Sequence, residues 1–257
     1  MAKGLRIEEL SVEVDGQRVL DDVNLTVPPG EVHVLFGPNG GGKTSLMLAV
    51  MGYPRYHVVA GRVYFGDQDI TGLELSERAQ LGIGIVHQRP PTIPGVTLGQ
   101  VLSYAAENDK VDQERIAHWT VKANMKDFVR RGLNSGLSGG EIKRSEVLQL
   151  LAMQPEFILL DEPDSGVDLE SISLVSEMVN TLLAYDADHL AKRRSGLIIT
   201  HAGHILDYVH VDRAHVMLDG TIGCTGNPLI VLEKIAECGY KECVRCVAER
   251  TTDGRPA

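Results

Sequence analysis

A glycine-rich octet lies between a predicted strand and a predicted helix. Its residues are Gly37, Pro38, Asn39, Gly40, Gly41, Gly42, Lys43 and Thr44, and Ser45 follows them. Glycines allow a tight turn in which successive backbone N–H groups point at one anion, and the new helix adds its positive end. The pattern predicts that Lys43 reaches the outer phosphates of a nucleoside triphosphate and that the Thr44 hydroxyl holds Mg²⁺. A plain glycine-rich turn is the alternative.

Two carboxylates follow an apolar run over residues 157–160. Asp161 and Glu162 are therefore expected at the carboxyl edge of a sheet, where ligands bind in open α/β folds. Asp161 would complete the Mg²⁺ shell. Glu162 would act as a general base that polarises a water molecule toward the γ-phosphate. A buried strand that merely ends in acids is the alternative.

The motif Leu137-Ser138-Gly139-Gly140-Glu141 predicts the start of another helix. Ser138 and Glu141 have the spacing of a capping box, and the two glycines leave N–H groups bare at a positive helix end. A capping box with no phosphate contact is the alternative. The motif is the signature of ATP-binding-cassette (ABC) ATPases, and the chain resembles that family over residues 5 to about 225.

The resemblance assigns further roles by position. It implies that Ser138, Gly139 and Gly140 contact the γ-phosphate of ATP held by a second copy of the chain. Gln88 matches the Q-loop glutamine, which touches Mg²⁺ and the attacking water and links to a helical subdomain. His87 beside it is expected to be packed or solvated. Asp168 matches the D-loop aspartate near the dimer seam.

Another position that matches the family is His201, at the end of an apolar run over 196–200. The resemblance implies that this histidine bonds the γ-phosphate and fixes Glu162, so Glu162, His201 and Gln88 are the expected catalytic residues. Lys143, on the signature helix, is a candidate to pair with Glu162 in the resting monomer.

Hydrophobic patterning predicts the elements that must position these residues. Alternation over 5–27 predicts an antiparallel hairpin, apolar runs predict buried strands, and longer patterns predict helices. The buried strands are expected at 82–86, 157–160 and 196–200, and the helices near 97–106, 112–124, 139–152, 169–190 and 203–208. Strands that alternate with helices indicate a parallel, doubly wound sheet.

The expected fold is therefore α/β: an ABC ATPase (P-loop NTPase) with a RecA-like parallel sheet core. An N-terminal antiparallel β subdomain and an inserted α-helical subdomain complete it. We expect one domain over 1–257, with the nucleotide-binding core at 1–88 and 154–235, the helical insertion at 89–153 and a C-terminal tail at 236–257.

Composition limits the possible partners and compartment. A net charge of −10 over 257 residues argues against a general nucleic-acid surface. No run approaches the roughly 18 apolar residues that span a bilayer, and the first residues show no secretory stretch. We expect a cytoplasmic protein whose four cysteines are thiols or ligands.

The chain departs from the family at the position expected to contact the adenine base of the nucleotide. Where the family has an aromatic residue that stacks on adenine, counting back from the phosphate loop reaches Val14. Base stacking contributes about 1–3 kcal/mol, so adenine binding should be weaker. ATP remains the expected nucleotide in preference to GTP.

Several segments resemble the SufC-type ATPases of iron–sulfur cluster assembly: 30–33, 93–97, 134–141 with Lys143, Arg144, Leu148 and Gln149, and 164–166. The resemblance implies that two copies dimerise around ATP and reshape a SufB- or SufD-like scaffold, which binds in the cleft near the Q-loop, without direct membrane contact. An ATPase subunit of a membrane transporter is the second possibility. A regulator acting on ribosomes or DNA is the third.

The cysteines near the C-terminus leave two interpretations. Cys238, Cys243 and Cys246 have the C-x₄-C-x₂-C spacing of plant-type ferredoxins. A fourth ligand is not obvious, with Cys224 the only candidate, and the surrounding run from 233 to 249 reads as a helix. A helix with incidental thiols is the preferred interpretation, so none is expected to be a metal ligand.

Overall fold

A six-stranded sheet forms the centre of the molecule. The structure is a computed structural model that describes residues 3–107, 111–183, 193–201 and 203–252. In that part of the chain the strand order is β10-β9-β3-β8-β7-β6. The strands are β3 (Val32–Phe36), β6 (Ile83–Val86), β7 (Phe157–Asp161), β8 (Ser195–Ile199), β9 (Arg213–Leu218) and β10 (Thr221–Gly226). All neighbours pair in parallel except β10 with β9, so the carboxyl ends of β3, β6, β7, β8 and β9 meet at one edge.

A second, antiparallel sheet is built from the N-terminal hairpin. It contains β1 (Leu5–Val14), β2 (Gln17–Val27), β4 (His57–Phe65) and β5 (Gln68–Asp69), in the order β2-β1-β4-β5. Asp15 and Gly16 both have positive φ, at 50° and 77°, as a two-residue hairpin turn requires. The expected hairpin over residues 5–27 is confirmed.

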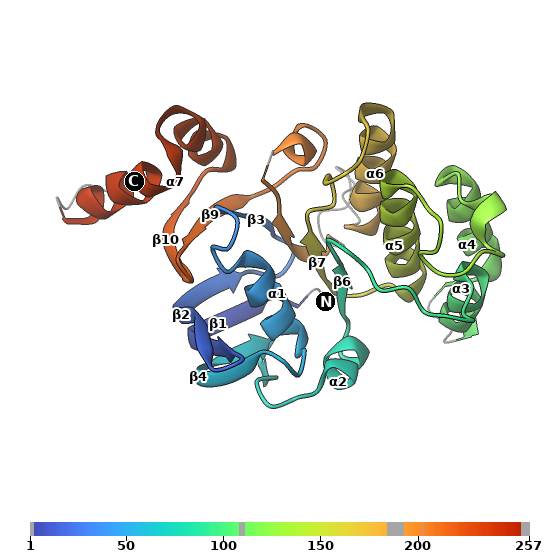
Figure 1. Ribbon diagram of the computed structural model, residues 1–257, viewed down its shortest axis with the longest axis horizontal. Helices are drawn as coiled ribbons and strands as arrows, with labels where there is room; N and C mark the ends of the chain where they lie inside the picture. The colour runs from blue at the N-terminus through green and yellow to red at the C-terminus, as the bar shows by residue number, and fades with distance from the viewer. Residues whose placement is uncertain (1–2, 108–110, 184–192, 202, 253–257) are drawn as a thin grey trace.

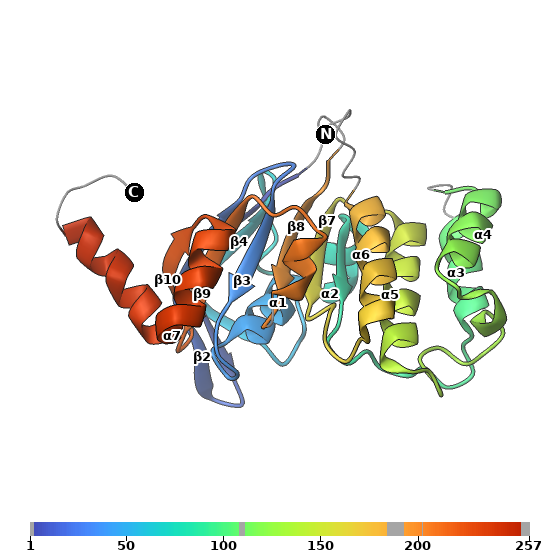
Figure 2. The same cartoon turned by 90° about the horizontal axis from the view of Figure 1, so that it is seen from above.

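The helices lie on both sides of the sheets. They are α1 (Lys43–Met51), α2 (Leu75–Gln80), α3 (Leu98–Glu107), α4 (Gln113–Lys122), α5 (Gly139–Met153), α6 (Leu169–Leu182) and α7 (Pro228–Thr252), with 3₁₀ turns η1 (Lys126–Phe128) and η3 (His204–Asp207). Figure 1 shows α3 to α6 gathered beyond β6 and β7, and α7 at the opposite end beside β10. The view from above agrees (Figure 2).

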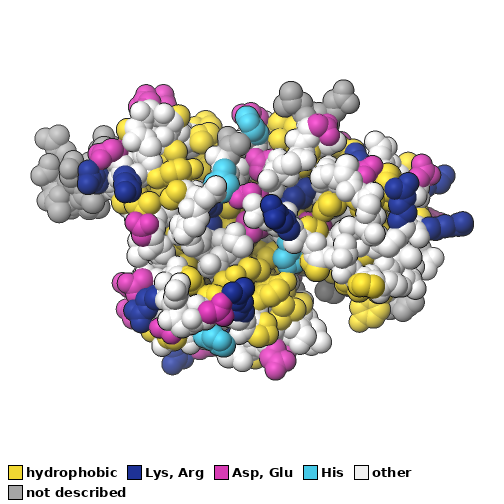
Figure 3. All heavy atoms as spheres, viewed as in Figure 1, with side chains coloured by type: hydrophobic (Ala, Val, Ile, Leu, Met, Phe, Trp, Pro, Cys, Tyr) yellow, Lys and Arg dark blue, Asp and Glu magenta, His cyan; other side chains and the backbone are white. Residues whose placement is uncertain are grey.

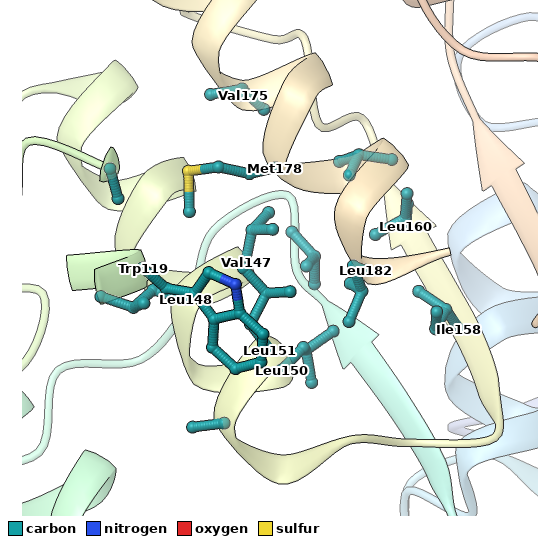
Figure 4. Packing of buried hydrophobic residues seen from close by; sticks show 14 of the residues in the cluster. Trp119, Val147, Leu148, Leu150, Leu151, Ile158, Leu160, Val175, Met178 and Leu182 are labelled. Atoms are coloured by element: carbon teal, nitrogen blue, oxygen red, sulfur yellow. The ribbon is translucent and has the colours of Figure 1, made fainter. Parts of the chain in front are cut away.

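The helical lobe is joined to the sheet by one continuous apolar core. Val147, Leu148 and Leu151 of α5 lie between the sheet and neighbouring helices, and Trp119 of α4 packs on the far side of α5 (Figure 4). These side chains are buried together, so α5 packs against both α4 and α6 in one core. The helix that begins at the signature motif is thus held by its apolar face.

The α/β class, the parallel sheet and the antiparallel N-terminal sheet agree with the sequence prediction, but several elements do not. Strands β4, β5, β9 and β10 were not expected, and the helix expected at 203–208 is a short 3₁₀ turn. Gly61 explains why the pattern over β4 was hard to read: it has φ 79° and packs against the backbone of Glu8 and Glu9 where the β1–β4 register shifts. The end of the helix expected at 169–190 lies outside the described residues beyond 183.

Candidate active site

The phosphate loop runs from the end of β3 to the start of α1. A Cβ atom at Gly37 would lie 2.2 Å from the carbonyl oxygen of Met217, so no larger residue fits there. The α1 N-cap, Gly42, offers no side-chain cap, and the first turn of α1 contains no acidic residue. The N–H groups of this helix end are therefore available to an anion, as the sequence predicted.

Lys43 is buried at the first position of α1. Its Nζ atom donates to the carbonyl oxygens of Gly37 at 2.8 Å and Pro38 at 2.9 Å. Burial lowers the pKa of Lys43, and the nearby carboxylates of Glu162 and Asp161 oppose that shift. The ammonium group therefore sits inside the loop, next to the acids that end β7.

Asp161 and Thr44 have the character of a divalent cation site. Burial raises the pKa of Asp161, and a hydrogen bond from the Thr44 side chain opposes this shift. Asp161 Oδ1 is buried and has no hydrogen-bond partner among the described residues. Mg²⁺ prefers carboxylate and hydroxyl oxygens, and a buried acceptor without a partner is costly unless a ligand satisfies it. Thr44 and Asp161 therefore fit the predicted Mg²⁺ ion.

Glu162 is held from both sides by the other two predicted catalytic residues. Gln88 Nε2 donates to Glu162 Oε2 at 2.6 Å, and His201 Nε2 lies 2.6 Å from Glu162 Oε1. The backbone of Glu162 has φ 49°, a strained conformation for this residue. Its N–H donates to Ile199 O of the neighbouring strand β8. The chain thus fixes both the direction and the environment of this carboxylate.

The expected pairing of Lys143 with Glu162 is wrong. Lys143 is 2% exposed, and its Nζ donates to the carbonyl oxygens of His87 at 2.5 Å, Gln88 at 3.3 Å and Asp161 at 3.4 Å. Glu162 instead accepts a hydrogen bond from the Gln88 side-chain amide. Lys143 therefore joins α5 to the ends of β6 and β7 through backbone oxygens, which the sequence pattern does not encode.

The sequence did not lead us to predict a role for a second charged residue of α5. Glu146, one turn after Lys143, is 6% exposed, and its Oε1 accepts the His87 N–H at 2.9 Å. The two ring nitrogens of His87 lie 3.3 Å from Glu146 Oε1 and 2.6 Å from the Tyr53 hydroxyl. His87, expected to be packed or solvated, is thus bonded on both sides. The sequence feature that could have identified Glu146 is its position on the apolar face of a predicted helix.

The signature motif is presented at the surface. Ser138 is exposed and caps α5, since its side chain accepts the Glu141 N–H while the Glu141 side chain accepts the Ser138 N–H. The predicted capping box is confirmed. A Cβ atom at Gly139 would lie 2.3 Å from the carbonyl oxygen of Gly166, so this glycine allows the signature loop to pack against the loop after β7.

Asp168 lies at the start of α6, close to the signature motif. Its two carboxylate oxygens accept hydrogen bonds from the Ser171 N–H at 2.8 Å and the Ser171 hydroxyl at 2.9 Å. A Cβ atom at Gly140 would come within 3.0 Å of Ser171. The loop that carries Asp168 and the N-terminus of α5 therefore form one packed surface.

Two of the cysteines lie together, Cys224 and Cys243, which share one buried cluster, whereas Cys238 lies apart from them at the surface. Cys238 is exposed on α7, Cys243 is buried, and Cys224 is buried on β10. Burial and the neighbouring Cys243 raise the pKa of Cys224 to about 12. The side chain of Cys246 lies outside the described part. Within that part, no group of three metal-binding side chains occurs, and no helix is long and apolar enough to cross a membrane.

Comparison with known proteins agrees with this geometry. The family described as "ABC transporter" matches residues 20–165. A probable ABC transporter ATP-binding protein of Streptococcus pyogenes serotype M18 is 39% identical over 250 residues, covering 93% of this chain and 95% of the relative. A probable ATP-dependent transporter of Synechocystis sp. is 39% identical over 249 residues, covering 92% and 94%.

Solved structures give the same result. A nucleotide-free ATP-binding cassette from an ABC transporter superposes with a TM-score of 0.73 at 26% identity, covering 94% of this chain and 98% of that one. The ADP conformation of an ATP-binding cassette has the same score and identity, covering 95% and 98%. With the phosphate loop, the signature motif and the Glu162 site in place, the chain belongs to the ABC transporter family, as one of its ATP-binding cassette ATPases.

Proposed function

We propose that this ABC ATPase is the ATP-hydrolysing subunit of a Suf-type iron–sulfur cluster assembly complex. The observation that carries the hydrolytic site is the Glu162 carboxylate, held between Gln88 and His201 beside Lys43. The SufC-like segments, which include 30–33, 93–97, 134–141 and 164–166, support the more specific role. The expected setting is the cytoplasm, without nucleic-acid binding.

Hydrolysis follows from the arrangement of these side chains. Glu162 accepts a proton from water as the water oxygen bonds to the γ-phosphorus and the bond to the ADP oxygen breaks. Gln88 and His201 restrict the Glu162 carboxylate to one orientation, and Lys43 donates to the outer phosphate oxygens. Thr44, Gln88 and Asp161 would hold Mg²⁺, and the bound ion would supply charge neutralisation on the phosphates.

Two copies are needed to complete each site in this proposal. The phosphate loop, residues 37–45, binds ATP from one protomer, and Ser138, Gly139 and Gly140 of the second protomer cover the γ-phosphate. Support comes from the exposure of Ser138 at the surface, where it caps the N-terminus of α5, the positive end of that helix. Asp168 lies on the same surface and is expected near the seam between protomers.

The scaffold partner is expected in the cleft beside the Q-loop. This cleft has a volume of about 230 Å³ and is lined by apolar side chains of β6, α5 and the segment 90–93. A SufB- or SufD-like protein that docks there would contact residues next to Gln88. We expect slow basal hydrolysis that rises when the scaffold binds.

A second candidate is an ATPase subunit that acts with a membrane permease, since the relatives are named as an ABC transporter ATP-binding protein and an ATP-dependent transporter. One pull-down of the native protein separates the two functions. Co-purification with a scaffold that contains iron and sulfide supports cluster assembly. Co-purification with a permease, and no iron or sulfide, supports the transporter. A scaffold that binds but leaves the ATPase rate unchanged contradicts the proposed coupling.

A further inference from the structure

The cleft beside the Q-loop contains two buried acceptors without partners. Glu146 and Asn134 both line the cleft, and neither Glu146 Oε2 nor Asn134 Oδ1, both buried, has a hydrogen-bond partner among the described residues. Most buried polar atoms in folded proteins are satisfied, and leaving a charged one unsatisfied is costly. Two such atoms in one cleft indicate a ligand that brings donors.

Apart from His87 and Gln149, the other residues that line the cleft are apolar. Ile93 and Met153 are 45% and 39% exposed at its rim, and Met51, Ile85 and Leu150 also line it. Figure 3 shows hydrophobic side chains gathered over the surface between α1 and α2 and toward β6. An apolar surface with a few well-placed polar groups is the usual make-up of a specific binding site.

The charge of Glu146 determines which donor fits. The nearest cation on its own helix, Lys143, interacts with Glu146 through charge, but its hydrogen bonds go to the carbonyl oxygens of His87, Gln88 and Asp161. The Oε1 atom of Glu146 is committed to His87. The remaining oxygen is therefore a carboxylate acceptor in an apolar wall, and a cationic side chain pairs with it best.

We propose that the partner docks with an aliphatic segment that carries one lysine or arginine, whose side chain donates to Glu146 Oε2 and whose neighbouring donor satisfies Asn134 Oδ1. This inference rests on the proposed function, because it specifies the chemistry of the docking partner. It goes further in naming the acceptor and the type of residue that the partner must supply.

The same contact connects the partner to the active site. Glu146 holds the backbone N–H of His87, the next residue is Gln88, and Gln88 donates to Glu162. A cation that pulls on Oε2 would shift Glu146 and, through His87, the Gln88 amide. Glu146 is thus a positioning residue as well as a docking residue.

The test replaces Glu146 without breaking its inner contact. Glu146→Gln keeps a carbonyl oxygen for the His87 N–H but turns the second oxygen into an amide donor. Glu177→Gln is the matched control, because Glu177 is an exposed acid on α6 that pairs with Lys122. A photo-crosslinking amino acid at Met153, on the rim of the cleft, identifies the partner segment by mass spectrometry in the full-length protein.

Two results together support the inference. The crosslinked peptide contains a lysine or arginine beside aliphatic residues, and Glu146→Gln weakens binding of that partner about tenfold or more while Glu177→Gln does not. A crosslinked segment without a basic residue, unchanged binding by Glu146→Gln, or no crosslink from an active protein overturns it. The identity of the crosslinked protein, scaffold or permease, tests the proposed function separately.

Discussion

Gln88 and Glu162 are joined by a 2.6 Å hydrogen bond from the Gln88 amide nitrogen to Glu162 Oε2. The two residues are far apart in the sequence and lie at the ends of neighbouring parallel strands, β6 and β7. His201, at the end of β8, contacts the other carboxylate oxygen. The order of strands in the sheet therefore assembles the hydrolytic site, and α5 holds one side of it through Lys143 and Glu146.

Removing either neighbour of Glu162 should slow hydrolysis more than it weakens nucleotide binding. Gln88→Ala and His201→Ala leave the carboxylate free to turn, and lost orientation of a general base costs about 10²-fold in kcat. Steady-state kinetics should show the fall in kcat with KM for ATP changed little. His210→Ala, which alters an exposed histidine beside Asp212, is the control and should keep its activity. Equal losses in all three variants would contradict these assignments.

Replacing Lys143 distinguishes its observed contacts from the expected ion pair. Lys143→Met keeps the apolar stem but removes three donors to backbone oxygens, which should lower the free energy of unfolding by about 1–3 kcal/mol. It should also reduce basal turnover, because the backbone of Gln88 loses a support. Urea denaturation and an ATPase assay measure both. An increase in turnover would mean instead that Lys143 restrains Glu162.

The base site should improve when an aromatic residue replaces Val14. Val14 lies at the end of β1, in the hairpin whose second strand approaches the phosphate loop, since a Cβ atom at Gly42 would meet Leu20. In Val14→Tyr a ring becomes available to stack on the base, which is worth about 1 kcal/mol or more. Titration calorimetry should show roughly fivefold tighter ATP binding. Unchanged affinity would place the base elsewhere.

A buried pair of histidines should make the protein sensitive to acid. His33 Nδ1 and His215 Nε2 are 2.9 Å apart, and both residues are buried at β3 and β9. Burial, with the neighbouring His33 and Arg213, lowers the pKa of His215 to about 3 from its usual 6.5. Between those values the unfolded chain binds a proton that the folded chain does not, so stability is present above pH 6.5 and is lost as pH falls toward 3.

Chemical denaturation at several pH values measures this effect. The free energy of unfolding should fall below about pH 6.5 with a slope from His215 of at most about 1.4 kcal/mol per pH unit. His215→Gln should flatten that part of the curve. A wild-type curve that is flat from about pH 6.5 to 4 would show that the pair does not resist protonation.

Motifs formed by residues close together in the sequence could be predicted. Contacts between residues far apart in the sequence could not. The glycine loop, the acids after β7 and the Ser138–Glu141 capping box depend on neighbours within a few residues. Lys143 was misassigned because its partners are backbone oxygens, which every residue possesses. The contact between Glu146 and His87 joins α5 to the end of β6, and only the fold brings those segments together. Strand β9 was missed because His215 and the charged Arg213 interrupt its apolar run.

In the proposed mechanism, one ATP is held by Lys43 of one protomer and Ser138 of the other. The most direct test is sedimentation of the Glu162→Gln protein, which should bind ATP without hydrolysing it. We expect ATP to convert it from monomer to dimer, and we expect Ser138→Arg in the same background to remain monomeric while still binding ATP at its own phosphate loop, with lower affinity because the second protomer no longer contributes. A protein that stays monomeric with saturating ATP, or a Ser138→Arg variant that dimerises equally well, would contradict the claim.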